Sequence, residues 1–209
     1  MAIIYNPNKR IFTLHTKHST YQMQVDSLGY LLHLYYGAKN NSSMEYVLTY
    51  VDRGFSGNPY ATGADRTYSL DALPQEFPTL GTGDYRNIAL DIKNSRGIES
   101  TNLLYKKHEI RKGKYALPGL PAVWADEAEA QTLEIVLADE NAGMEVHLLY
   151  GVLEEVDVIT RSAVIRNIGT ETVTIEKAAA ACLDFVSGNY DVIRFYGKHA
   201  FERNVERTV

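Results

Sequence analysis

The chain has 209 residues, of which 45% are hydrophobic and 22% charged, so it can bury the core of one large domain or two small ones. This ordinary composition indicates neither a disordered chain nor a membrane protein, and no apolar run approaches the length of a membrane span. The formal net charge is −5 and the Lys and Arg residues form no large cluster. We therefore expect no nucleic-acid partner, because binding phosphates requires a basic face.

The N-terminus and the cysteine content predict a cytoplasmic protein. The first ten residues lack the apolar segment of a secretory signal peptide. Cys182 is the single cysteine and stands in an Ala-rich segment, so no disulfide framework is possible. We interpret Cys182 as a small core residue rather than a nucleophile.

Alternation of apolar and polar residues predicts a series of β-strands in the first part of the chain. It is clearest over residues 19–25, where Tyr21, Met23 and Val25 share one face and Gln22 and Gln24 share the other. Further strands are predicted over residues 10–16, 30–36 and 46–51.

The second part of the chain shows the same pattern. We expect residues 88–92 to pair with residues 103–105 through the turn at Gly97, and residues 131–139 to form a hairpin with 144–152. Residues 156–167 and 173–175 are predicted as strands because they alternate or are rich in β-branched residues. Repeated strands without intervening helices predict an all-β fold, an antiparallel β-sandwich.

Two alanine-rich segments, residues 125–130 and 178–182, have high helix propensity. The first is too short for a stable helix before the strand that starts near Leu133, and the second lies between β-branched and apolar residues. We interpret both as strand or loop.

Residues 65–86 follow neither the helical nor the strand period. Two prolines and the glycines Gly81 and Gly83 predict an ordered loop with special backbone angles. Its density of charged and aromatic residues is typical of a binding loop rather than a linker. The alternative is a surface excursion whose charges are merely solvated.

Several kinds of catalytic chemistry lack their sequence signals. No phosphate-binding loop, dinucleotide fingerprint or nucleophile elbow is present. His15 and His18 are the closest approach to a metal-ligand pair, but an i,i+3 pair on a strand points to opposite faces, so we predict no metal site. The acidic pairs at 126–127 and 154–155 are interpreted as solvated edges rather than acid/base dyads.

Asp52 and Arg66 are the candidate ligand-binding residues. They flank a second aperiodic, turn-rich stretch, residues 53–59. A carboxylate accepts hydrogen bonds from two hydroxyls and a guanidinium donates in a planar fork, so together they suit a polyhydroxylated ligand. The alternative is an Asp–Arg pair that only pins one loop to the other.

Eight short segments make the sequence similar to a known family. They are residues 33–37 (HLYYG), 65–71 (DRTYSLD), 74–78 (PQEFP), 83–86 (GDYR), 119–122 (GLPA), 131–135 (QTLEI), 157–162 (DVITRS) and 190–193 (YDVI). Each segment alone is weak evidence, but together they span nearly the whole chain in order. The chain resembles the N-terminal β-domain of bacterial α-galactosidases of glycoside hydrolase family 36.

The resemblance implies a partial β-supersandwich over residues 1–209, followed in the parent protein by a catalytic (β/α)₈ barrel and a C-terminal β-domain. The family hydrolyses terminal α-galactosides such as melibiose and raffinose-type sugars with retention, without metal or organic cofactor. Both catalytic aspartates belong to the barrel. We therefore expect no catalytic residue in this chain, and no activity of the chain alone.

The resemblance also implies a role for the N-terminal domain in sugar binding. The two family residues that reach the galactose pocket match Asp52 and Arg66. The turn at residues 57–59 and the additional residues 61–64 depart from the family pattern near this point. The implied partners are an α-galactoside, the chain's own barrel and neighbouring subunits of a homo-oligomer. A free-standing carbohydrate-binding module and a purely structural interaction domain are the alternatives.

Overall fold

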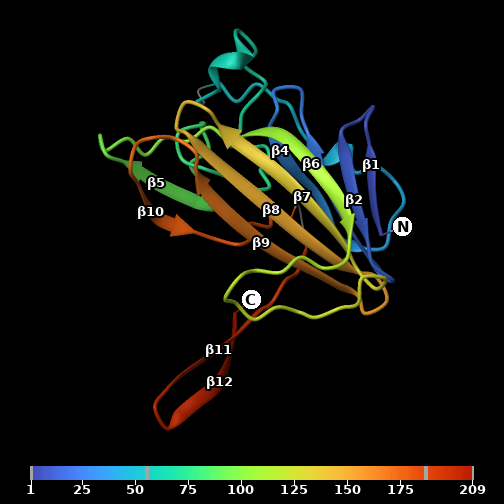
Figure 1. Ribbon diagram of the computed structural model, residues 1–209. Coiled ribbons are helices and arrows are strands. Elements are labelled where there is room, and N and C mark those ends of the chain that lie inside the picture. Colours follow the sequence, from blue (N-terminus) through green and yellow to red (C-terminus); the bar gives the residue numbers. More distant parts are fainter. Residues whose placement is uncertain (1, 55–56, 186–187, 209) are drawn as a thin grey trace.

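The structure of this protein is a computed structural model that describes residues 2–54, 57–185 and 188–208. In these ranges the strands pair antiparallel, which confirms the predicted all-β fold class (Figure 1). The strands are β1 (Ile3–Asn6), β2 (Ile11–His15), β3 (Ser19–Val25), β4 (Leu31–Ala38), β5 (Leu90–Asn94), β6 (Leu104–Lys112), β7 (Gln131–Asp139), β8 (Met144–Leu153), β9 (Val158–Asn167), β10 (Val173–Ala178), β11 (Val192–Lys198) and β12 (Phe201–Thr208). Two single-turn 3₁₀ helices, η1 (Glu45–Val47) and η2 (Tyr60–Thr62), lie between β4 and β5.

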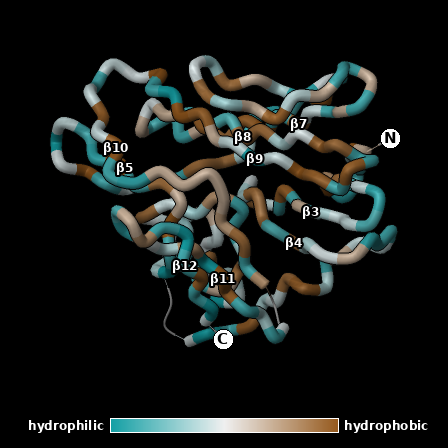
Figure 2. The backbone as a smooth tube through the Cα atoms, turned by 90° about the horizontal axis from the view of Figure 1, so that it is seen from below, coloured by the Kyte–Doolittle hydropathy of each residue, from teal (hydrophilic) through white to brown (hydrophobic). Residues whose placement is uncertain are grey.

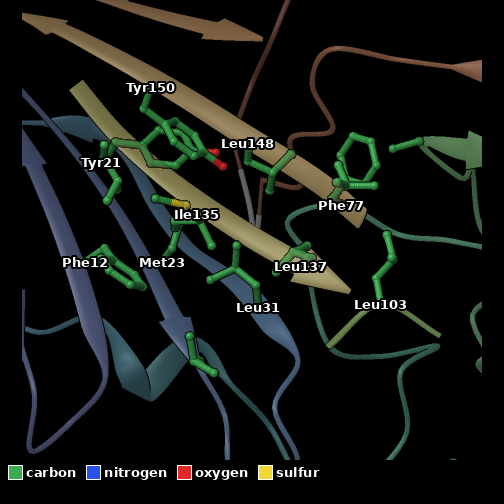
Figure 3. Packing of buried hydrophobic residues seen from close by; sticks show 14 of the residues in the cluster. Phe12, Tyr21, Met23, Leu31, Phe77, Leu103, Ile135, Leu137, Leu148 and Tyr150 are labelled. Carbon is green, nitrogen blue, oxygen red and sulfur yellow. The ribbon is translucent and has the colours of Figure 1, made fainter. Parts of the chain in front are cut away.

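Two four-stranded sheets, with strand orders β1-β2-β3-β4 and β6-β7-β8-β9, enclose the main core. Each sheet is a meander in which neighbours in sequence are neighbours in space. Alternate residues of β3 and β8 point into the core, as the two-residue period requires. Figure 3 shows Phe12 and Met23 of one sheet packed together with Ile135 and Leu148 of the other.

The loop of residues 65–86 covers the free edge of β4. The backbone N–H of His33 donates to Pro74 O at 2.7 Å and that of Glu76 donates to Leu31 O at 2.9 Å. A second apolar cluster, formed by Tyr30, Leu32, Tyr68, Leu70 and Leu73, lies beneath this loop. The loop therefore occupies an edge that would otherwise expose unpaired backbone groups.

The predicted pairing of residues 88–92 with 103–105 is wrong. β5 pairs with β10, in a register that runs from Val173 opposite Asn94 to Ala178 opposite Leu90, while β6 pairs with β7. The turn after β5 is closed by one hydrogen bond back to the strand, in which the N–H of Asn94 donates to Ile98 O at 3.0 Å. Beyond it the chain leaves β5, whose apolar residues join the main core.

The strand predicted over residues 46–51 is also wrong, because this stretch begins with η1 and continues without regular structure. Side chains of β3 hold the two residues that precede this stretch. Gln22 accepts from the N–H of Met44 at 3.1 Å, and Gln24 donates to the Glu45 carboxylate at 3.2 Å.

The two alanine-rich segments contain no helix in the described part of the chain. Residues 125–130 form a turn, and β10 ends at Ala178 with loop after it, in agreement with the interpretation as strand or loop. β1 and the β11–β12 hairpin were not predicted from the alternation of apolar and polar residues. This hairpin projects away from the two large sheets (Figure 1), and its side chains of Phe195, Tyr196 and Phe201 are exposed. Figure 2 shows stretches of hydrophobic residues near the labels of β11 and β12.

Candidate functional site

Asp52 and Arg66 lie side by side, as their positions on neighbouring loops predicted. Arg66 Nη2 is 3.3 Å from Asp52 Oδ1 and donates to Gly54 O at 3.1 Å. The same carboxylate oxygen accepts from the N–H of Gly54 at 2.7 Å. The side chains remain 65% exposed for Arg66 and 51% exposed for Asp52, so both can reach a ligand. Phe55 and Ser56 of the turn-rich stretch lie outside the described residues.

Short-range hydrogen bonds fix the backbone before Arg66. The Asp65 carboxylate accepts from the hydroxyl of Thr67 at 2.7 Å and from its N–H at 2.8 Å. These bonds lower the pKa of Asp65 from its ordinary value, because they favour the charged form. The carbonyl of Asp65 also accepts from the amide of Asn58 at 3.3 Å, which joins the two loops.

Arg86 holds the second half of the loop to the first. It lies 2.8 Å from Asp84 and donates to Leu70 O at 3.0 Å and to Leu73 O at 2.7 Å. Its hydrogen bond to Asp84 raises the pKa of Arg86, and Asp84 is buried. The interpretation of these charges as merely solvated is wrong for Asp84, whose carboxylate ties the loop together.

Two glycines bring the turns of residues 57–60 and 81–85 into direct contact. Gly83 has φ +90°, and a Cβ built on it would lie 2.2 Å from Gly57 O. That backbone angle strains any L-residue, and the neighbouring atom is backbone that a rotamer change cannot move. Glycine is therefore the residue that this contact requires.

We predict that Gly83→Ala destabilises the domain by at least about 2 kcal/mol, since it combines a left-handed backbone angle with a steric clash. The matched control is Gly119→Ala, where φ is +74° but no atom lies within 4 Å of the new Cβ. It should cost about 1 kcal/mol from strain alone. Chemical denaturation of both variants measures the difference, and equal costs would show that the Gly57–Gly83 contact is not tight.

Glu76 is a buried carboxylate that sequence analysis did not single out. Tyr150 and Tyr21 donate to it at 2.6 and 2.7 Å, Arg161 Nη2 lies 2.9 Å away and His33 Nδ1 3.2 Å away. Figure 3 shows Tyr21 and Tyr150 next to each other in the core. Glu76 is 0% exposed, and these groups surround its carboxylate. It therefore holds the two sheets and the loop together and does not bind a substrate.

The other titratable residues considered from the sequence have structural surroundings. His15 contacts Thr20 and His18 contacts Asp157, so the two rings have different partners. Among the described residues no group of three or more His, Cys, Asp or Glu side chains is arranged to hold a metal ion. Cys182 is half-buried against the core, and burial raises the pKa of its thiol, in keeping with a packing role.

The two acidic pairs also lie where solvated residues are expected. Asp126, Glu127 and Glu155 are exposed and Glu154 is partly exposed. Glu127, Glu154 and Glu155 line one shallow cavity of about 440 Å³ together with Lys112. Nothing at this cavity distinguishes one carboxylate as an acid and another as a base.

Comparison with known sequences decides the family. The sequence profile of the "Glycosyl hydrolase family 36 N-terminal domain" matches residues 29–209. The chain belongs to this family. The resemblance inferred from the eight short segments is thereby confirmed, and Asp52 and Arg66 lie inside the matched region.

Relatives of this family 36 N-terminal domain are longer proteins. The bifunctional α-galactosidase/sucrose kinase AgaSK of Mediterraneibacter gnavus is 80% identical over 208 residues, which is 100% of this chain and 22% of that protein. The α-galactosidase AgaA of Geobacillus stearothermophilus is 42% identical over 209 residues, which is 99% of this chain and 28% of that protein. The chain thus spans less than a third of these two relatives.

Solved structures of relatives agree with the fold. The galactosidase domain of AgaSK matches 99% of this chain with a TM-score of 0.96 at 80% identity, and the chain covers 29% of it. A variant of AgaA from Geobacillus stearothermophilus, in complex with raffinose, matches 94% of this chain with a TM-score of 0.88 at 41% identity, and the chain covers 27% of it. In the described part of this chain, no helix is long and apolar enough to cross a membrane.

Proposed function

We propose that the protein containing this chain is a cytoplasmic α-galactosidase that hydrolyses terminal α-galactosides such as melibiose and raffinose with retention. The family membership and the relatives named α-galactosidases support this proposal. Residues 1–209 then form part of the N-terminal β-supersandwich domain. The catalytic (β/α)₈ barrel, with both catalytic aspartates, and the C-terminal β-domain lie outside this chain.

The observation that carries the proposed sugar contact is the exposed pair of Asp52 and Arg66, 3.3 Å apart. The carboxylate accepts from sugar hydroxyls, while the guanidinium donates in a fixed fork. The hydrogen bonds of both side chains to Gly54 hold them in place before a ligand arrives. The barrel supplies the reacting carboxylates, and this pair orients the galactosyl unit.

The proposed protein partners are the chain's own barrel and neighbouring subunits of a homo-oligomer. The β11–β12 hairpin exposes Phe195, Tyr196 and Phe201, each more than half exposed. Several large apolar side chains exposed on one hairpin favour an interface at this place. In such an oligomer Asp52 and Arg66 serve either their own barrel or that of a neighbour.

The test is hydrolysis of raffinose by the full-length protein, followed by NMR. We expect α-galactose as the first product, because two displacements at the anomeric carbon retain its configuration. Residues 1–209 expressed alone should release no galactose, since the catalytic aspartates are proposed to lie in the barrel. Release of β-galactose first would contradict retention. Tight galactose binding by residues 1–209 alone would favour the alternative of an independent carbohydrate-binding module.

A further inference from the structure

A cavity of about 290 Å³ lies between the turns of residues 57–60 and 81–85. Gly57 and Gly83 both line it and approach each other closely, which fixes the distance between the two turns. Its lining residues are Tyr30, Gly57, Asn58, Pro59, Tyr60, Gly81, Thr82, Gly83, Tyr85 and Asn102. We call it the two-turn cavity.

One hydrogen bond connects the two-turn cavity to the segment that carries Arg66. Asn58 lines the cavity and donates to the carbonyl of Asp65, the residue before Arg66. Gly54, which contacts both members of the pair, precedes Gly57 by three residues. The cavity wall is thus joined to the residue that precedes Arg66, which makes the cavity a candidate for the next unit of a ligand bound at the pair.

Thr82 is the most unusual residue of the cavity wall. Its side chain is 6% exposed, and its hydroxyl has no hydrogen-bond partner in the described ranges of the chain. A buried hydroxyl without a partner loses about 1–3 kcal/mol, so such groups are usually satisfied by water or by a ligand. A ligand hydroxyl in the two-turn cavity would supply the missing partner to Thr82.

The remaining lining groups suit a neutral ligand with both apolar and hydroxyl surfaces. Among the described residues, no charged side chain lines the cavity. Tyr85 is 79% exposed and Tyr60 is fully exposed, so both present ring surface to a ligand. Tyr30 donates to the amide oxygen of Asn102 at 2.8 Å, which leaves the NH₂ group of Asn102 as the donor to a ligand. Rings and neutral amides together are the groups that recognise a sugar ring.

We propose that the two-turn cavity is a second sugar subsite, which holds the hexose unit next to the galactosyl unit of an oligosaccharide. This inference rests on the proposed α-galactosidase function. The cavity volume suits one sugar ring rather than a longer chain, because it lies just below the range of about 300–1,000 Å³ of the pockets that hold drug-sized ligands. Thr82 and Asn102 bind hydroxyls of that ring, and Tyr85 packs on its apolar face.

The experiment compares two substrates of the full-length protein. Raffinose carries a second sugar unit, whereas α-galactosyl fluoride carries only a fluorine as leaving group. Thr82→Val should lower the ratio of kcat/KM for raffinose to kcat/KM for the fluoride about two- to tenfold, as loss of one neutral hydrogen bond requires. Tyr85→Ala should lower the same ratio by a similar factor. Because Tyr85 is exposed, its replacement does not endanger folding.

Thr101→Val is the matched control. Thr101 is 1% exposed and its hydroxyl also lacks a partner in the described part of the protein, but Thr101 does not line the two-turn cavity. We expect it to leave the ratio unchanged. An unchanged ratio in Thr82→Val and Tyr85→Ala, or an equal loss on both substrates, overturns the subsite.

The proposed function and the subsite fail in different ways. If the wild-type protein hydrolyses neither substrate, the α-galactosidase proposal fails, and calorimetric titration with raffinose then decides about the cavity. Raffinose binding that Thr82→Val weakens and Thr101→Val preserves supports the subsite. Absence of raffinose binding to the wild-type protein, or equal binding to all three proteins, overturns it.

Discussion

Replacing Arg161 with Met should lower the free energy of unfolding by about 3–5 kcal/mol at pH 7, because it leaves the buried Glu76 carboxylate without its cation. Arg161 also donates to Tyr21 at 3.0 Å and to the backbone carbonyls of Glu76, at 2.8 Å, and Cys182, at 3.3 Å. One side chain therefore joins β9, β3, the loop of residues 65–86 and the segment after β10.

The pH dependence of this loss follows from the pKa of Glu76. Burial disfavours the charged carboxylate, but Arg161, His33 and Tyr150 outweigh it and lower the pKa below its ordinary value of 4.5. The stabilisation is therefore complete above pH 4.5 and is lost as the pH falls through the pKa of the folded protein. Without Arg161, burial raises the pKa of Glu76, so the folded variant loses stability as the pH rises. The difference in the free energy of unfolding between the wild type and Arg161→Met should thus be largest near pH 7 and decrease towards pH 4.5.

Denaturant unfolding of Arg161→Met, of Arg194→Met and of the double variant Arg161→Met/Glu76→Gln tests this prediction. Arg194 pairs with Glu206 at 2.6 Å, but its side chain is 66% exposed, so its replacement should cost less than about 1 kcal/mol. The double variant should recover part of the loss, because a neutral amide is cheaper to bury than a charge. A single variant as stable as the wild type would contradict the role of the network.

The sheets could be predicted from the sequence where the pattern is local. Residues 19–25 and 131–152 alternate, and they form β3 and the β7–β8 hairpin at nearly the predicted bounds. The partner of a short strand is not a local property. β5 has only a few residues to display a pattern, and its pairing with β10 depends on how the chain packs between residues 95 and 172.

The burial of the Glu76 carboxylate could not be predicted either, because it also depends on residues that are distant in the sequence. In the sequence Glu76 is one charge in a loop with two prolines, for which exposure is the ordinary expectation. Its partners Tyr21, His33, Tyr150 and Arg161 come from four strands, separated by up to 140 residues. The prediction that residues 65–86 form an ordered loop is confirmed. The alternative, that the charges of this loop are merely solvated, holds only for some of them.

The site was partly predictable. Asp52 and Arg66 were identified because they flank turn-rich stretches and match the family pattern, and their contact requires only that adjacent loops meet. The two-turn cavity depends on the close approach of Gly57 and Gly83, which no alternation or motif specifies. The glycine-rich turn at residues 81–83 was the one local signal for it.

In the full-length protein, Asp52→Ala or Arg66→Ala should lower kcat/KM for α-galactosides about ten- to hundredfold. A hydrogen bond to a charged group contributes about 1.5–3 kcal/mol, and 1.4 kcal/mol corresponds to a factor of ten in rate. Galactose differs from glucose in its axial 4-hydroxyl. A site that binds this hydroxyl discriminates against a sugar without it, because the site's own polar groups are then left unpaired.

The matched control is Arg96→Ala. Arg96 lies 3.3 Å from Glu171, and the side chains are 66% and 44% exposed, nearly the values of the Asp52–Arg66 pair. Because Arg96 lies on the turn after β5, its replacement should leave kcat/KM unchanged, with folding checked by circular dichroism. If Asp52→Ala and Arg66→Ala behave like this control, the pair only pins one loop to the other. If they lower kcat/KM while the fold stays intact, these two exposed charges are sugar contacts of the proposed enzyme.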